Sequence, residues 1–323
     1  MKIAILDDYQ DSVRKLDCFA LLQGLNVKIF THSAKGEGQL SIRLREFDIL
    51  VLIRERTRLR RSLLSKLPQL KLICQTGRLG SHIDLVAAKE LGIQVIEGVG
   101  DPVAPAELTW ALILAASRKI PAYASLLKQG LWQSTSVNPA QNTLGRVLKN
   151  RALGIWGYGK IGQLVAGYAR AFGMQVQVWG SEQSRELAIK DGFLAAQSQQ
   201  EFFSTSDIIT LHCRLSESTH HLIGVADLSV MKPDALIVNT SRAELIAPGA
   251  LEQALKLGRP GYAACDVYES EPLTPDNELL KIENALLTPH IGFVEEQSYE
   301  QYFRPLFEAI VDFVHEKTKH ASQ

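Results

Sequence analysis

Short apolar runs alternate with amphipathic stretches along the first third of the chain. Five of these runs are typical of buried strands: residues 2–6, 27–30, 48–53, 70–74 and 93–96. Helical spacings lie between them, as in Leu63, Leu64 and Leu67, and a further helical stretch runs from Asp84 to Gly92. Alternation of this kind predicts a parallel sheet with helices on both faces, so residues 1–100 are expected to form one α/β domain.

A second α/β pattern follows a break at residues 98–105, where two prolines stand within four residues. An apolar helix is expected over residues 106–120, ended by Pro121, and residues 133–150 are polar and rich in turn formers. Further strands are predicted at residues 152–156, 174–179, 207–211, 235–239 and 262–267. A helix is predicted at residues 248–257, with Pro248 at its start, and an amphipathic helix is predicted from Glu296.

These patterns predict two doubly wound parallel-sheet domains, Rossmann-like or flavodoxin-like, with a cleft between them. The terminal helix is expected to return to the first domain. Residues 1–100 with 294–323 would then form a substrate-binding domain, and residues 101–293 a dinucleotide-binding domain.

The second domain opens with a glycine-rich turn between a strand and a helix. The turn reads Gly157-Tyr-Gly159-Lys-Ile-Gly162, directly after the apolar run 152–156. Gly157 permits the tight bend, Gly159 lets a pyrophosphate approach the backbone, and Gly162 lets the helix pack closely on the strand. Because strand, turn, helix and strand occur in this order, the turn predicts dinucleotide binding rather than an ordinary bend.

Composition and charge exclude several other classes of protein. The 323 residues carry a formal net charge of +0, so a nucleic-acid or anionic-membrane partner is not expected. The longest apolar run, residues 108–116, is too short to span a bilayer, and residues 1–7 do not resemble a secretory signal. The four cysteines are widely spaced, as expected for free thiols in the cytoplasm, and no metal site is expected.

Three polar residues follow predicted strands or lie in loops beyond the glycine-rich turn. Arg242, Glu271 and His290 are therefore expected at the edge of the sheet where ligands bind in open α/β folds. Reduction of a 2-keto acid needs a forked cation for the carboxylate, a proton carrier near neutrality, and a group that orients that carrier. Arg242, His290 and Glu271 match those needs in turn, although each taken alone also suits a surface or loop role.

The motifs around these residues resemble those of the D-isomer-specific 2-hydroxyacid dehydrogenase family over nearly the whole chain. The matching strings, in family order, are GYGKIG, LHCRLSESTHHLIG, MKPDALIVNTSR, CDVYESEP and LLTPHIG. The resemblance implies that Arg242 binds and polarises the 2-keto acid, that His290 is the acid/base, and that Glu271 stabilises the protonated form of the histidine. It implies that Asp266 holds the nicotinamide carboxamide.

The same resemblance implies the remaining coenzyme contacts, which we expect from the following residues: Gly157, Tyr158, Gly159, Lys160, Ile161, Gly162, Ser181, Cys213, Thr240 and Asp266. The coenzyme is NAD or NADP. Gly180 stands where NAD-using enzymes have an acid, and Ser181 or Arg185 could bind the 2′-phosphate of NADP. The carboxylates of Glu182 and Glu186 would repel that phosphate, and on balance the sequence favours NAD.

Substrate contacts are expected from two segments of the first domain. The family's glycine-containing loop matches residues 76–84 here, one residue shorter than usual, which suggests backbone N–H groups from Leu79 and Gly80. Arg54 lies in Arg54-Glu-Arg-Thr57, which resembles the phosphate-holding segment of some phosphoglycerate dehydrogenases. A solvated basic run is the alternative reading, because Arg58, Arg60 and Arg61 follow.

The chain is thus expected to be a cytoplasmic NAD(P)-dependent D-2-hydroxyacid dehydrogenase acting on a small 2-keto or 2-hydroxy acid. The alternatives are a D-3-phosphoglycerate dehydrogenase specifically, or a non-catalytic dinucleotide-sensing protein of the same fold. A homodimer is also expected, because the helix carrying Leu108, Trp110, Leu112, Ile113 and Leu114, with nearby Trp132, is more apolar than one buried face needs. A buried helix joining the domains is the other explanation.

Overall fold

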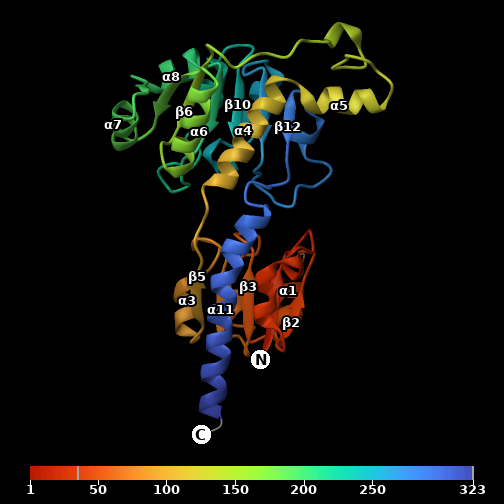
Figure 1. Ribbon diagram of the computed structural model, residues 1–323, viewed down its shortest axis with the longest axis vertical. Helices are drawn as coiled ribbons and strands as arrows, with labels where there is room; N and C mark the ends of the chain where they lie inside the picture. The colour runs from red at the N-terminus through yellow and green to blue at the C-terminus, as the bar shows by residue number, and fades with distance from the viewer. Residues whose placement is uncertain (35, 322–323) are drawn as a thin grey trace. The chain divides into compact units, whose positions relative to one another are not determined.

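The chain folds into two units, each built around one parallel β-sheet (Figure 1). The structure is a computed structural model that describes residues 1–34 and 36–321. One unit comprises Met1–Asp101 with Val294–Gln323, and the other comprises Pro102–Phe293. The two parallel sheets confirm the predicted fold class, and the division lies one residue beyond the predicted boundary. Residues 322 and 323 of the predicted first domain lie outside the described residues.

The sheet of the first unit has the strand order β2-β1-β3-β4-β5. Its strands are β1 (Lys2–Leu6), β2 (Asn26–Ile29), β3 (Ile49–Leu52), β4 (Leu72–Gln75) and β5 (Gln94–Glu97). All four pairings are parallel. Each strand lies within two residues of its predicted range. The inner strands β1, β3 and β4 are buried on both faces and read as continuous apolar runs, whereas the edge strands β2 and β5 are partly exposed.

Helices cover this sheet and include the last segment of the chain. They are α1 (Glu37–Leu44), α2 (Arg61–Leu64), α3 (Leu85–Glu90) and α11 (Glu296–Ala321), with the 3-10 turns η1 (Val13–Lys15) and η2 (Asp17–Leu22). Helix α11 packs on η2, where the rings of Phe19 and Phe307 meet edge to face at 6.3 Å. The Cys18 N–H donates to the Glu300 carboxylate. The C-terminal helix therefore belongs to the first unit, as the sequence predicts.

The sheet of the second unit has seven strands in the order β12-β11-β10-β9-β6-β7-β8. They are β6 (Ala152–Trp156), β7 (Gln175–Trp179), β8 (Leu194–Ala195), β9 (Ile208–Leu211), β10 (Leu236–Asn239), β11 (Tyr262–Cys265) and β12 (Ala285–Leu287). The helices are α4 (Val103–Ser117), α5 (Ile120–Lys128), α6 (Lys160–Ala171), α7 (Glu182–Lys190), α8 (Gln199–Thr205), α9 (Val225–Ser229) and α10 (Ala250–Lys256). Three 3-10 turns complete the unit: η3 (Pro139–Gln141), η4 (Ala243–Leu245) and η5 (Glu278–Lys281).

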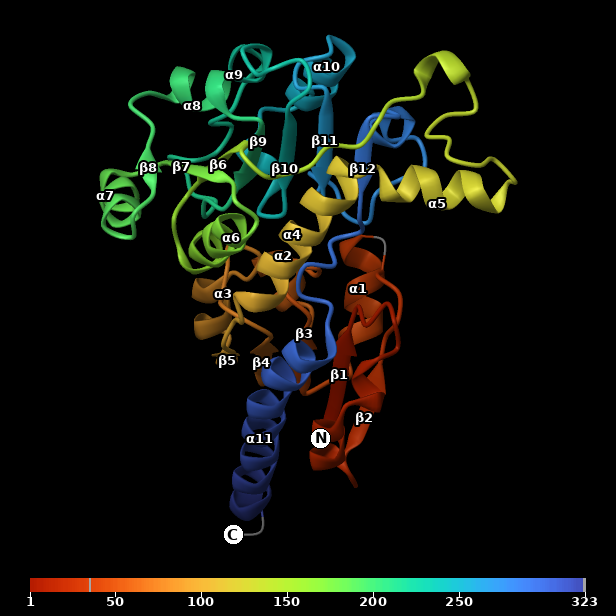
Figure 2. The same ribbon diagram turned by 45° about the horizontal axis from the view of Figure 1, so that its top comes forward.

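Two hydrophobic cores lie on opposite faces of this sheet. Figure 2 shows the ribbon of the helices that cover them, among them α4 and α6 for one core and α8, α9 and α10 for the other. Leu236 and Val238 of β10 face the core under α4 and α6, whereas Ile237 faces the core under α8, α9 and α10. Side chains alternate between faces along a strand, so one apolar run supplies both cores. None of the helices among the described residues is both long and apolar enough to cross a bilayer.

Three details differ from the sequence-based expectation. Pro121 does not only end the first apolar helix; it lies in the first turn of a second helix, α5, where a missing N–H costs no helical hydrogen bond. Helix α10 begins at Ala250, after Gly249 in a left-handed conformation, so Pro248 lies outside it. The short strands β8 and β12 were not predicted, because runs of two and three residues carry no clear period.

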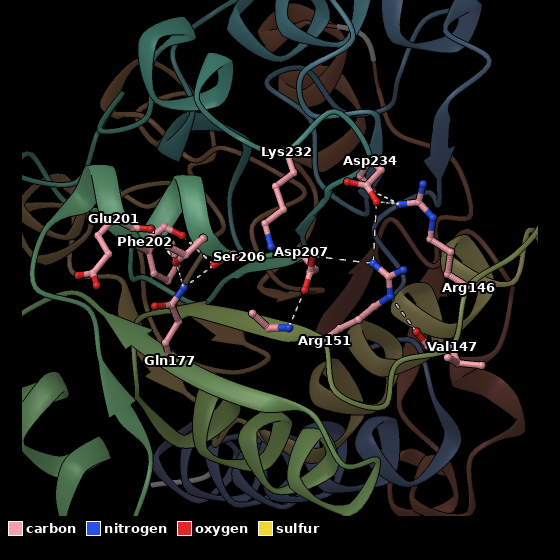
Figure 3. A network of polar contacts seen from close by, with 12 residues as sticks. Arg146, Val147, Arg151, Gln177, Glu201, Phe202, Ser206, Asp207, Lys232 and Asp234 are labelled. Atoms are coloured by element: carbon pink, nitrogen blue, oxygen red, sulfur yellow. Dashed lines mark hydrogen bonds and ion pairs between the residues drawn. The ribbon is translucent and has the colours of Figure 1, made fainter.

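A polar network lies at the ends where β9 and β10 begin (Figure 3). Asp207 accepts hydrogen bonds from the Ala152 N–H and from Lys232 Nζ, both at 2.8 Å. Arg151 approaches Asp207 at 3.8 Å. Burial acts to raise the pKa of Asp207, but the bonds from Lys232 and the Ala152 N–H outweigh it and lower that pKa. The carboxylate therefore joins β6 to β9 in its charged form.

Replacing Asp207 with alanine is expected to lower the free energy of unfolding by about 1–3 kcal/mol, because it leaves a backbone donor and a lysine without their acceptor. A carboxyl whose pKa is lowered on folding contributes stability above its unfolded pKa, near ~4. The difference between wild type and Asp207→Ala should therefore be full above that pH and shrink as the pH falls. Urea unfolding at several pH values measures it.

The matched control is Asp234→Ala in the same network, since Asp234 pairs with Arg146 but its side chain is 42% exposed. An exposed pair contributes less than about 1 kcal/mol. Equal losses for the two variants would contradict the role given to Asp207.

Candidate active site

The glycine-rich turn joins β6 to α6 and leaves room for a ligand. Gly157 has φ +95°, and its N–H donates to the Trp179 carbonyl at 2.9 Å. A Cβ at Gly162 would overlap the Gly157 carbonyl oxygen, so the close approach of helix and strand requires glycine there. A Cβ at Gly159 would meet no atom within 4 Å among the described residues. The turn therefore fits a pyrophosphate, which would lie against backbone N–H groups at the start of α6.

The other residues of the turn differ in what they can offer a coenzyme. The Tyr158 side chain is buried, and its hydroxyl donates to Asp191 at 3.0 Å, so only its backbone can face a ligand. Ile161 is partly buried and packs against the core under α6. Lys160 is exposed at the first position of α6, where its charge would favour phosphate.

Two predicted coenzyme residues stand just past the carboxyl ends of neighbouring strands. Cys213 follows β9, and its Sγ lies 3.4 Å from the Trp156 carbonyl oxygen, next to the glycine-rich turn. Thr240 follows β10, and its hydroxyl bonds the Thr109 hydroxyl of α4 at 2.6 Å. The Ser241 hydroxyl donates to the Cys213 carbonyl at 2.7 Å and joins the two strand ends. The structure thus gathers both residues at the sheet edge that carries the turn.

The three predicted catalytic residues come from the ends of three adjacent strands. Arg242 follows β10, Glu271 follows β11 and His290 follows β12, and these strands are neighbours in the sheet. The Nδ1 atom of His290 lies 2.6 Å from Oε2 of Glu271. The other carboxylate oxygen, Oε1, accepts the Tyr268 N–H at 2.9 Å. With Nδ1 held by Glu271, Nε2 is the ring nitrogen left for proton exchange with a ligand.

Arg242 acts on this pair through its charge. Burial acts to raise the pKa of Glu271, but the hydrogen bond and charge of His290, the Tyr268 N–H and the charge of Arg242 together lower it. Arg242 itself is half-buried, and its Nη1 donates to the Ser241 carbonyl at 2.7 Å. The site therefore holds a guanidinium, a carboxylate that stays ionised, and an imidazole on that carboxylate.

Asp266 has a role that sequence analysis missed. Its Oδ1 accepts bonds from the Thr288 hydroxyl at 2.6 Å and the Ile291 N–H at 2.8 Å, and its Oδ2 accepts the Gly292 N–H at 2.8 Å. The buried carboxylate thereby ties the end of β11 to the loop that carries His290. A carboxylate has about four acceptor positions, so one remains for the expected nicotinamide carboxamide. No sequence signal separates these two uses of one aspartate.

The predicted substrate residues all lie in the first unit, at the carboxyl ends of its strands. Arg54 follows β3 with φ +53°, and its guanidinium lies over Gly77, where a Cβ would overlap Nη1. The Leu79 N–H donates to Glu97 at 2.8 Å, so a substrate carboxylate would have to displace Glu97 to use it. The structure brings Arg54 and the loop that begins at Gly77 together, whereas Leu79 is already engaged.

The second arginine of the basic segment is structural. Arg56 Nη1 donates to the Asp7 carbonyl at 2.6 Å, and its guanidinium lies 4.5 Å from the Tyr9 ring centroid. The neighbouring Thr57 hydroxyl bonds the buried Asp7 carboxylate. Arg56 and Thr57 therefore hold the end of β1, and the Arg-x-Arg-Thr spacing alone does not distinguish them from Arg54.

Comparison with known proteins gives matches over nearly the whole chain. The family model described as D-isomer specific 2-hydroxyacid dehydrogenase, NAD binding domain, matches residues 110–292. A D-3-phosphoglycerate dehydrogenase of Methanocaldococcus jannaschii is 35% identical over 92% of this chain and 54% of that protein. A glyoxylate reductase of Aeropyrum pernix is 38% identical over 71% of this chain and 68% of that protein. The chain thus spans about half the length of the first of these relatives.

Solved structures agree with these matches. A phosphoglycerate oxidoreductase from Vibrio cholerae is 50% identical, with a TM-score of 0.94 over 98% of this chain and 99% of that chain. A D-lactate dehydrogenase from Aquifex aeolicus, complexed with NAD and lactic acid, is 28% identical, with a TM-score of 0.74 over 98% of this chain and 97% of that chain.

Replacing His290 with phenylalanine is expected to raise the pKa of Glu271. Phenylalanine keeps a flat ring at this position, but it removes the hydrogen bond and charge that lower this pKa. Carbon-13 NMR titration of labelled glutamate carboxyls measures the change. Glu278, an exposed carboxyl whose pKa is lowered by Lys281, is the internal control and should not move. An unchanged pKa for Glu271 would contradict the described contact.

Proposed function

The chain belongs to the D-isomer specific 2-hydroxyacid dehydrogenase family of NAD-binding oxidoreductases, and we propose that it interconverts a 2-keto acid and the D-2-hydroxy acid with NAD(P)H. The observation that supports this most directly is the 2.6 Å contact between His290 and Glu271. It lies at strand ends of the same sheet that carries the dinucleotide turn. Ligands bind at this edge in open α/β sheets.

Each residue of the site has a definite part in this reaction. The bound coenzyme supplies the hydride for C2 of the keto acid, or accepts it in the reverse direction. Arg242 binds the substrate carboxylate and polarises the keto oxygen through its forked guanidinium. His290 gives a proton from Nε2 to the keto oxygen as the hydroxyl forms, and takes it back in the reverse direction. Glu271 orients the ring through Nδ1 and stabilises the imidazolium.

A substrate panel tests the proposal. Absorbance at 340 nm is followed with glyoxylate, pyruvate, hydroxypyruvate, branched 2-keto acids and 3-phosphohydroxypyruvate, with each coenzyme. We expect turnover of at least one acid, and a fall in kcat of about 10²–10⁴-fold in His290→Phe with unchanged coenzyme affinity. Full turnover by the variant would show that His290 is not the proton carrier. Coenzyme binding without turnover of any acid would favour a dinucleotide-sensing protein instead.

The position of Arg54 is evidence that the substrate carries a second anionic group, as a phosphoglycerate-type substrate does. Its guanidinium lies over Gly77, at the loop expected to receive the substrate carboxylate. Its Cζ lies 5.8 Å from the Tyr302 ring centroid, so the aromatic face of α11 holds the cation in place. Relatives named as phosphoglycerate enzymes occur among both the sequence and the structure matches.

Arg54→Ala is expected to raise KM at least tenfold more for 3-phosphohydroxypyruvate than for glyoxylate, because loss of a charge-assisted contact costs about 1.5–3 kcal/mol. Steady-state kinetics with both substrates measure the ratio. The matched control is Arg58→Ala, an exposed arginine of the same segment, which should leave both KM values unchanged. Equal effects of Arg54→Ala on both substrates would rule out the second anionic group.

A homodimer is also part of the proposal, on a surface that shares only Trp132 with the one first expected. Trp110, Leu112 and Ile113 of α4 are buried in the core with α6, so the apolar character of α4 is used within the unit. Exposed apolar side chains instead follow α4 in the chain: Ile120, Leu127, Trp132, Val137, Leu144 and Val147. We assign self-association to α5 and the segment after it. Sedimentation velocity in solution tests this by measuring whether the protein is a dimer.

A cytoplasmic location stays a prediction. All four cysteines are unpaired, as expected for a reducing compartment.

A further inference from the structure

The end of β7 lies directly beside the dinucleotide turn. The Trp179 carbonyl accepts the Gly157 N–H at 2.9 Å. An ideal Cβ on Gly180 would stand 3.5 Å from the Gly157 nitrogen and 3.7 Å from its Cα. In this fold the adenosine ribose lies at the end of the second strand, where an acid binds the 2′-hydroxyl of NAD or an arginine accommodates the 2′-phosphate of NADP. Residues 179–185 therefore lie where this fold distinguishes NAD from NADP.

The backbone at the acid's usual position excludes a carboxylate. Gly180 has φ +139°, a conformation that L side chains rarely adopt, so an aspartate or glutamate there would require the backbone to change. The next residue, Ser181, has φ −59° and begins α7. Its hydroxyl accepts the Ser184 N–H at 3.2 Å and donates to the Ser184 hydroxyl at 3.0 Å. The acid's usual position is thus a glycine, and the residue after it is a neutral helix cap.

Arg185 supplies the cation on the first turn of α7. Its N–H donates to the Ser181 carbonyl at 3.1 Å, so the two residues are one turn apart on the helix. Its guanidinium Cζ lies 5.0 Å from the Trp179 ring centroid, which holds it against the last residue of β7. The Nε atom is buried, and no acceptor among the described residues bonds it. A bound phosphate would therefore be held by the terminal nitrogens of the guanidinium, not by Nε.

Two carboxylates on α7 would repel an anion bound at the end of β7. Glu182 and Glu186 are both exposed, so water and salt screen their charge. Arg185 is partly buried and stacked, and therefore stays in place. The cation is thus the better positioned of the nearby charges.

We propose that this chain prefers NADP(H) to NAD(H), with Arg185 binding the 2′-phosphate and the Ser181 hydroxyl turning from Ser184 to donate to it. This inference rests on the family's coenzyme use and deepens the proposed function. It revises the preference for NAD that the sequence suggested, because the sequence shows neither the backbone of Gly180 nor the stacking of Arg185 on Trp179.

Binding measured without turnover tests the inference. Isothermal titration of the intact protein with NADPH, NADH, 2′,5′-ADP and 5′-AMP isolates the contribution of the 2′-phosphate. We expect NADPH to bind at least about tenfold more tightly than NADH, and 2′,5′-ADP more tightly than 5′-AMP. Arg185→Gln should weaken NADPH and 2′,5′-ADP about tenfold to a hundredfold, and leave NADH and 5′-AMP nearly unchanged.

Two further variants make the test specific. Arg170→Gln is the matched control, because Arg170 also stacks on an aromatic ring, Phe193, but lies on α6 and donates to the Asp191 carbonyl. It should leave all four affinities unchanged. Ser181→Asp keeps a good helix cap and adds a carboxylate, so it should reverse the preference toward NADH.

The outcomes separate this inference from the proposed function. Tighter binding of NADH by the wild type, or unchanged NADPH and 2′,5′-ADP affinities in Arg185→Gln, would overturn the inference and leave the dehydrogenase proposal intact. Failure of the wild type to bind either coenzyme would overturn both.

Discussion

The buried carboxylate of Asp266 is the constraint on which the catalytic end of the second unit depends. It accepts two backbone N–H groups and one hydroxyl from residues 288–292, and so fixes the loop between β12 and the end of the unit. His290 within that loop has φ +52°, a region that costs a non-glycine residue about 1–3 kcal/mol. Hydrogen bonds to a charged acceptor offset that cost. They hold the imidazole where Glu271 can bond it.

Much of the fold could be read from the order of apolar runs. Ten strands, from β1 to β11 without β8, fall within two residues of their predicted ranges, because each is a short apolar or alternating run bounded by turn residues. Strand β12 was missed since its three residues are only half-buried and carry no distinct period. Helix α5 was missed since Pro121 reads as a stop, although proline is equally suited to a first turn.

The candidate site was predictable as residue types at strand ends, but not as geometry. Parallel strands carry their carboxyl ends to one edge, so Arg242, Glu271 and His290 were expected together before any distance was known. Side-chain partners were not predictable: the Leu79 N–H is taken by Glu97, and the Tyr158 hydroxyl by Asp191. Such bonds join residues far apart in sequence or depend on local rotamers. No periodicity encodes them.

Helix α11 closes the hydrophobic core of a unit whose other residues lie more than 190 positions earlier in the chain. Phe303 and Phe307 are fully buried there, and Phe307 meets Phe19 of η2. During synthesis from the N-terminus, residues 1–101 therefore emerge from the ribosome without the aromatic cover that completes them. The second unit is one continuous segment and can fold without waiting for later residues. The unit begun earliest is therefore finished last, and until then the apolar face that α11 covers stays exposed.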